Sequence, residues 1–105
     1  MTREEALRAL ADARKNIDAI DLRLLELLNQ RTRMVEEIGR AKESLALPIY
    51  EPTREEDVFR NVTDHNLGPL TSDAVKGIFD RIIDEMRTLQ RMRRQQKEQG
   101  EKDKC

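Results

Sequence analysis

The opening segment constrains the fold most strongly, because it is long and contains no proline. From Thr2 to about Ser44 the apolar residues recur in steps of three and four, which predicts one continuous amphipathic helix. Thr2 and Glu5 have capping-box spacing, and only Gly39 disfavours helix inside the segment. Such a helix would be about 64 Å long, whereas a compact domain of this size has a radius of gyration of about 13 Å. The remaining chain is too short to cover it, so we predict a helical homo-oligomer, most simply a dimer.

A second, shorter helix is predicted after a loop that is bounded by Pro48 and Pro52. It should open at Thr53, because Glu56 follows three residues later in a second capping-box spacing. Its helical pattern fades near Asn66. The turn sequence LGPL then separates it from the last helix.

The third helix should begin at Thr71 or Ser72 and run to about Gln96. We therefore predict an all-α fold with three helices per chain, a long one, a short one and a third. Residues 1–96 are expected to form one helical domain. The polar residues 97–105 are expected to form a disordered tail.

Composition argues against several classes of function. Charged residues make up 39% of the chain but leave a net charge of only -1, which argues against nonspecific nucleic-acid binding and a polybasic membrane anchor. No apolar run approaches the roughly 20 residues that span a bilayer. The N-terminus is too polar for a secretory signal, and the single Cys105 excludes an internal disulfide, which fits a cytoplasmic protein.

The face of the first helix that should be buried carries four charges, at Arg14, Asp21, Arg31 and Lys42. Charges at such positions often fix register, or their long side chains reach water. Several buried cations are costly unless each is paired, and Asp21 serves only one or two of them. Arg31 and Lys42 are about 16 Å apart along the axis, whereas Arg14 is about 25 Å from Arg31. An antiparallel partner helix would bring its own Arg14 between Arg31 and Lys42, which predicts a pocket for a dianion.

The other helices offer further polar candidates. Arg54 and Glu55 precede Val58 and Phe59 by four residues each, so both should point with the apolar face of the second helix. Gln90 continues a stripe that begins with Ile83 and Met86. His65 has no second metal ligand at a useful spacing, so no metal site is predicted.

Five short motifs in this order resemble the all-helical class of chorismate mutase: RKNIDAID, LLELLNQR, IGRAK, YEPTREE and the glutamine of TLQ. The resemblance covers roughly residues 7–92. It implies an intertwined homodimer with two equivalent sites, which rearranges chorismate to prephenate in phenylalanine and tyrosine biosynthesis. No cofactor is implied.

The resemblance also implies roles for individual residues. Arg14 would come from the neighbouring subunit and, with Arg31, hold the substrate carboxylates. Lys42 and Gln90 would donate to the ether oxygen, where negative charge develops. With Gln at this position, activity should not require acid pH.

Four further residues would contact the substrate. Glu55 would accept from the ring hydroxyl, with help from Glu51, and Arg54 would lie at the edge of the pocket. Met86 stands where some relatives carry a small hydroxyl residue, and Glu51 where some carry Asp.

Two alternatives remain open from the sequence. A lyase of the same fold that removes pyruvate from isochorismate would use the same cations. A helical dimerisation or regulatory module would explain the apolar face without any chemistry. Relatives also occur alone or fused to other enzymes, and the sequence does not distinguish these contexts.

Overall fold

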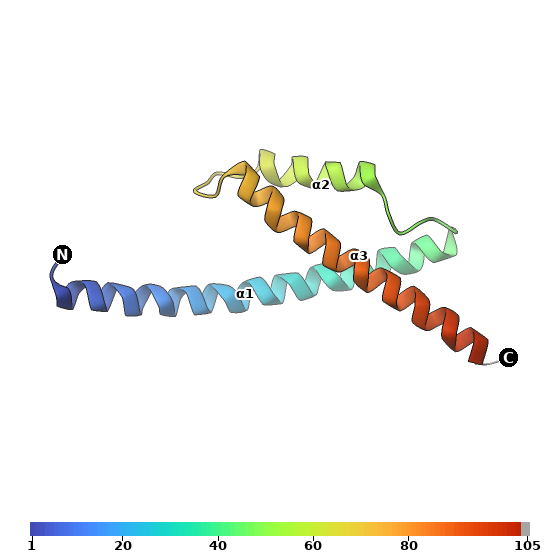
Figure 1. Ribbon diagram of the computed structural model, residues 1–105, viewed down its shortest axis with the longest axis horizontal. Helices are drawn as coiled ribbons and strands as arrows, with labels where there is room; N and C mark the ends of the chain where they lie inside the picture. Colours follow the sequence, from blue (N-terminus) through green and yellow to red (C-terminus); the bar gives the residue numbers. More distant parts are fainter. Residues whose placement is uncertain (104–105) are drawn as a thin grey trace. The chain divides into compact units, whose positions relative to one another are not determined.

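The computed structural model describes residues 1–103 and contains three helices, α1 (Arg3–Ser44), α2 (Pro52–Asp64) and α3 (Ser72–Asp103), with no strand in that range (Figure 1). The predicted all-α fold is confirmed. The chain divides into an N-terminal unit, Met1–Met34, and a C-terminal unit, Val35–Cys105, and the boundary falls inside α1.

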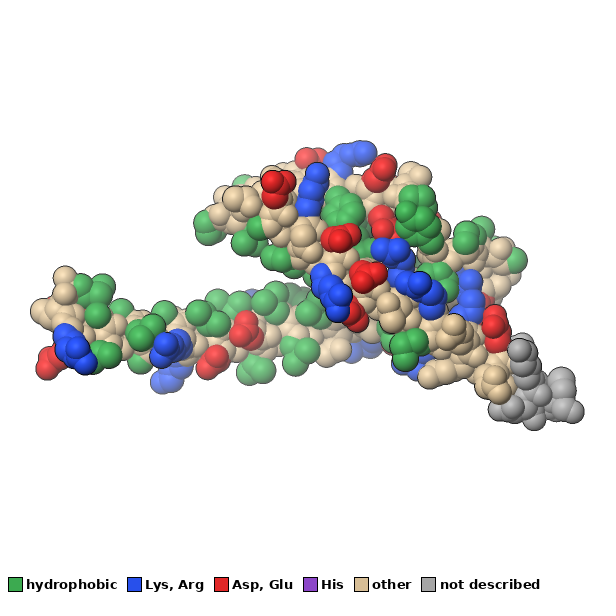
Figure 2. Space-filling model, in the orientation of Figure 1, with side chains coloured by type: hydrophobic (Ala, Val, Ile, Leu, Met, Phe, Trp, Pro, Cys, Tyr) green, Lys and Arg blue, Asp and Glu red, His purple; other side chains and the backbone are tan. Residues whose placement is uncertain are grey.

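The N-terminal unit is a single helical segment whose side chains are exposed up to position 30. Its first turn is capped as predicted, since the backbone N–H of Glu5 donates to Thr2 Oγ1 at 3.1 Å. Apolar side chains are exposed along it, including Leu10 at 45%, Ile17 at 53% and Leu24 at 52% (Figure 2). An isolated amphipathic helix gains little stability in water, because most helical stability in proteins comes from packing of the apolar face.

The C-terminal unit joins the last turns of α1 to α2 and α3. Helix α2 packs against α3 (Figure 1). A hydrogen bond of 3.3 Å from Gln90 Nε2 to the Val35 carbonyl ties α3 to α1. Val75 and Ile83, both on α3 and both 6% exposed, are the buried apolar residues in the described part of the chain. The core is small for a stable domain of this length, which again leaves apolar surface uncovered.

The start of α2 differs from the prediction. The helix begins at Pro52, and Glu51 occupies the N-cap position without a side-chain capping hydrogen bond. Proline is favoured in the first turn because its missing N–H has no helical partner there. The predicted capping box from Thr53 to Glu56 is therefore wrong. The carboxylate of Glu51 instead pairs with Lys42.

The start of α3 agrees with the prediction, but its end does not. The N–H of Ala74 donates to Thr71 Oγ1 at 3.1 Å, which caps the helix. Helix α3 continues past Gln96 and through Gly100 to Asp103, in a stretch that contains no proline. Lys97 also contacts Glu43 at 3.0 Å. The division into domain and tail stays a prediction, and Cys105 lies outside the described residues.

Candidate functional site

Lys42 is the one residue of α1 that is buried within the described chain, with 8% exposure. Its Nζ donates to the Ile49 carbonyl at 2.7 Å and lies 2.6 Å from Oε1 of Glu51. Both partners belong to the segment between α1 and α2, which folds back over the end of α1. An ammonium group has three N–H donors, so two are used and one is left for a ligand.

Gln90 approaches α1 next to Gly39. A Cβ built at Gly39 would lie 3.7 Å from Gln90 Cγ, which is ordinary van der Waals contact. The Gln90 amide donates one N–H to the Val35 carbonyl. Its second N–H is therefore available, and the side chain is half-buried. The predicted position of Gln90 on the buried face of α3 is confirmed.

Glu55 is the better covered of the two polar candidates on α2. Its side chain is 18% exposed, and its Oε2 lies 3.2 Å from Arg87 Nε of α3. Arg54 is exposed instead of lying with the apolar face. The prediction placed both residues on one face, but adjacent positions are about 100° apart around a helix, and only Glu55 faces α3.

The remaining candidates divide between the two units. Met86 is half-buried on α3, in the C-terminal unit. Arg14, Asp21 and Arg31 belong to the N-terminal unit, where Arg14 and Asp21 are exposed.

A pocket of about 380 Å³ lies between the last turns of α1 and the second half of α3. Of the predicted site residues, Gln90 alone lines it, while Ile49, whose carbonyl binds Lys42, forms part of its wall. Its rim carries both signs of charge: Glu36 pairs with Arg93 at 3.3 Å, and Glu43 pairs with Lys97. This hollow adjoins the Lys42 site, and the charges of its lining do not cancel, because four basic residues stand against two carboxylates: Arg40, Arg93, Arg94 and Lys97 against Glu36 and Glu43.

Sequence reasoning missed two residues near Glu55. Arg87 contacts the Glu55 carboxylate, and its guanidinium carbon lies 5.2 Å from the centre of the Tyr50 ring. Arg87 follows Ile83 by four residues, so the helical period would have placed it on the buried face. The contact with Tyr50 depends on the fold of the segment before α2, which no local pattern gives.

The described residues contain no group of three or more side chains suited to hold a metal ion. None of the described helices is long and apolar enough to cross a membrane.

Comparison with known proteins decides the family. Residues 13–91 match the family described as chorismate mutase type II. The chain belongs to this family. A chorismate mutase (form II) from Thermus thermophilus has a similar structure, with a TM-score of 0.77 and 34% identity, covering 79% of this chain and 94% of that one. Chorismate mutase from Helicobacter pylori, solved in complex with prephenate, gives a TM-score of 0.74 at 26% identity, covering 80% and 91%.

A longer relative also matches. The bifunctional chorismate mutase/prephenate dehydratase of Neisseria gonorrhoeae is 37% identical over 78 residues, which are 74% of this chain and 21% of that protein. The chain thus spans about a fifth of the length of this curated relative.

Proposed function

We propose that this protein is an isomerase that rearranges chorismate to prephenate, without a cofactor. The observation that carries the proposal is the arrangement around Lys42, a buried ammonium held by Ile49 and Glu51 with one N–H donor left over. Membership of the chorismate mutase type II family supports it. A cytoplasmic location stays a prediction from the sequence.

The chemistry needs hydrogen-bond donors at one oxygen. In this intramolecular Claisen rearrangement the ether C–O bond breaks while a C–C bond forms, so negative charge develops on the ether oxygen and no proton is transferred. Lys42 and Gln90 are proposed to donate to that oxygen with their unused N–H groups. Their hydrogen bonds strengthen as the negative charge on this oxygen grows, so they stabilise the transition state more than the ground state. Because both donors are already in place, they need no reorganisation during the reaction.

The carboxylates of the substrate need other cations. We assign them to Arg31 and to Arg14 of the partner subunit, in a homodimer with two equivalent sites. The exposed apolar surface of the N-terminal unit supports the dimer, because such a surface is stable only when a partner covers it. Holding both carboxylates would also keep the substrate in the compact conformer that reacts.

The ring hydroxyl of chorismate is assigned to Glu55, whose carboxylate accepts hydrogen bonds only. Glu51 would assist mainly by fixing Lys42, since its Oε1 already contacts the ammonium group. Arg54 is exposed on α2 and is assigned to the edge of the site. Met86 is assigned a substrate contact in place of the hydroxyl residue that some relatives carry there.

The test is the loss of chorismate absorbance with time, with prephenate identified after its conversion by acid to phenylpyruvate. Turnover by the wild type that is abolished in Lys42→Ala would support the proposal. No turnover by a protein that circular dichroism shows to be helical and folded would refute it. An assay with isochorismate and detection of pyruvate would then test the lyase of the same fold.

A further inference from the structure

Arg87 is an arginine on the packed face of α3. It follows the buried Ile83 by four residues, and its side chain is 26% exposed. A guanidinium group cannot lose its charge in a protein, so covering it is costly unless neighbours compensate. The neighbours of Arg87 therefore indicate the role of its side chain.

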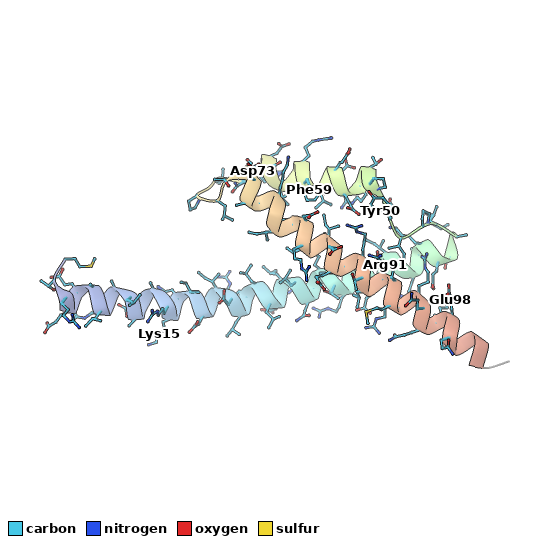
Figure 3. The ribbon with its side chains drawn as sticks, in the orientation of Figure 1. Lys15, Tyr50, Phe59, Asp73, Arg91 and Glu98 are labelled. Atoms are coloured by element: carbon cyan, nitrogen blue, oxygen red, sulfur yellow. The ribbon has the colours of Figure 1, made fainter. Side chains whose placement is uncertain are left out.

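Three elements supply these neighbours. Nε of Arg87 lies 3.2 Å from Oε2 of Glu55 on α2. The guanidinium carbon lies 5.2 Å from the centre of the ring of Tyr50, which Figure 3 labels and which lies in the segment before α2. Asp84, one turn earlier on α3, is more distant, with its Oδ1 3.9 Å from Nη2. The close contacts thus come from α2 and from the segment that leads into it.

The contact with Glu55 is an ion pair without a completed hydrogen bond. Nε of Arg87 is buried and has no hydrogen-bond partner among the described residues, although Oε2 of Glu55 is near. A buried donor left unpaired is costly, so the pair stands to gain when the carboxylate turns slightly toward Nε. Arginine also presents its donors in a rigid plane, which restricts the directions from which a carboxylate binds.

We infer that Arg87 is a positioning residue for Glu55, which makes the site selective for a substrate that carries a ring hydroxyl. The inference rests on the proposed function. Arg87 holds Oε2 and leaves Oε1 to accept a hydrogen bond. Because the carboxylate only accepts, it favours a hydroxyl donor, and a substrate without one would leave its Oε1 acceptor without a hydrogen bond.

Tyr50 extends the role of Arg87 to Lys42. Stacking of a guanidinium on an aromatic ring fixes both groups. Tyr50 directly precedes Glu51, which pairs with Lys42. Arg87 therefore contacts both Glu55, the proposed hydroxyl-binding residue, and Tyr50, in the segment that holds the ammonium group of Lys42.

The test compares Arg87→Gln with the matched control Arg81→Gln. Arg81 lies on the same helix and forms an ion pair of 2.6 Å with Glu85, but its side chain is 74% exposed and touches no proposed site residue. We expect Arg87→Gln to lower kcat/KM for chorismate about tenfold, because Glu55 loses the ion-pair partner that positions it, and Arg81→Gln to leave it unchanged. For a chorismate analogue that lacks the ring hydroxyl, Arg87→Gln should match the wild type.

A double-mutant cycle with Glu55→Gln separates positioning from general structural support. If Arg87 acts through Glu55, then Arg87→Gln has little further effect once Glu55 is Gln. Arg87→Lys, which keeps the charge and most of the stem, should show an intermediate loss and serves as the test if Arg87→Gln fails to fold.

Each outcome bears on a distinct claim. Losses that add fully in the cycle, or that are equal for chorismate and the analogue, would overturn the inference while the proposed function stands. A folded wild type without turnover would overturn the proposed function, and this inference with it.

Discussion

Replacing Lys42 by methionine should separate catalysis from stability. Methionine keeps most of the length of the stem but removes the ammonium group that the Ile49 carbonyl and Glu51 hold at 2.7 and 2.6 Å. Removal of one donor to a developing oxyanion typically costs about 10²–10³ in rate. We expect kcat of Lys42→Met to fall by about that factor for chorismate, with a smaller change in KM.

The stability of the same variant should change little. The partner carboxylate of Glu51 is 48% exposed, so water screens the ion pair and solvates Glu51 when Lys42 is lost. The variant also avoids the cost of burying the cationic Lys42 side chain, since this residue is only 8% exposed. These opposing terms should leave the free energy of unfolding within about 1 kcal/mol of the wild type.

The assay pairs initial rates from chorismate absorbance with thermal unfolding at equal protein concentration. Lys76→Met, an exposed lysine of α3, is the control for loss of a charge and should match the wild type in both measurements. Two results would refute the reasoning about Lys42: a Lys42→Met protein that keeps more than about a tenth of the wild-type kcat, or one whose rate falls only because it unfolds.

Three further variants test other parts of the molecule. Gln90→Glu should be slow at neutral pH and faster in acid, since only a protonated carboxyl donates a hydrogen bond; a flat pH–rate profile would contradict this. Gly39→Ala should stay active and gain up to about 1 kcal/mol, because its Cβ would meet Gln90 Cγ at an ordinary 3.7 Å; a large loss in unfolding temperature would contradict it. Leu24 is 52% exposed in one chain, and Leu24→Lys would place a charge on the proposed dimer interface. We expect this variant to shift toward monomer in analytical ultracentrifugation, whereas an unchanged mass would place the interface elsewhere.

The long first helix and the cap of the third could be predicted because their signals are local. The hydrogen bond from Glu5 N–H to Thr2 Oγ1, like that from Ala74 N–H to Thr71 Oγ1, follows from residues three positions apart. The start of α2 could not be predicted, because the capping-box spacing at Thr53 competed with the helix-start signal of Pro52. Sequence spacing alone does not say which of two adjacent start signals prevails.

The candidate site was predictable where helical spacing decides burial. Lys42 and Gln90 were placed on packed faces, and both are covered in the structure. The partners of Lys42 were not predictable, because Ile49 and Glu51 reach it through an irregular segment whose path depends on tertiary contacts. The contact between Arg87 and Glu55 joins two helices across a turn and likewise has no local signature.

The charges of the C-terminal unit explain why the proposed chemistry depends on the proposed dimer. Glu51 offsets the charge of Lys42, and Glu55 offsets that of Arg87. Among the described site residues of this unit, Arg54 alone carries a positive charge without an ion pair, and it is exposed.

One exposed cation does not compensate a substrate with two carboxylates, so we propose that the substrate also binds Arg31 and Arg14 of the partner subunit. We therefore expect a monomeric variant to lose chorismate turnover even when Lys42 and Gln90 keep their positions, and Arg14→Ala to lose turnover while remaining dimeric. Mixing inactive Arg14→Ala with inactive Lys42→Ala should restore part of the activity, because a mixed dimer has one site with both residues intact. No recovery in mixtures shown to exchange subunits would place Arg14 outside the site.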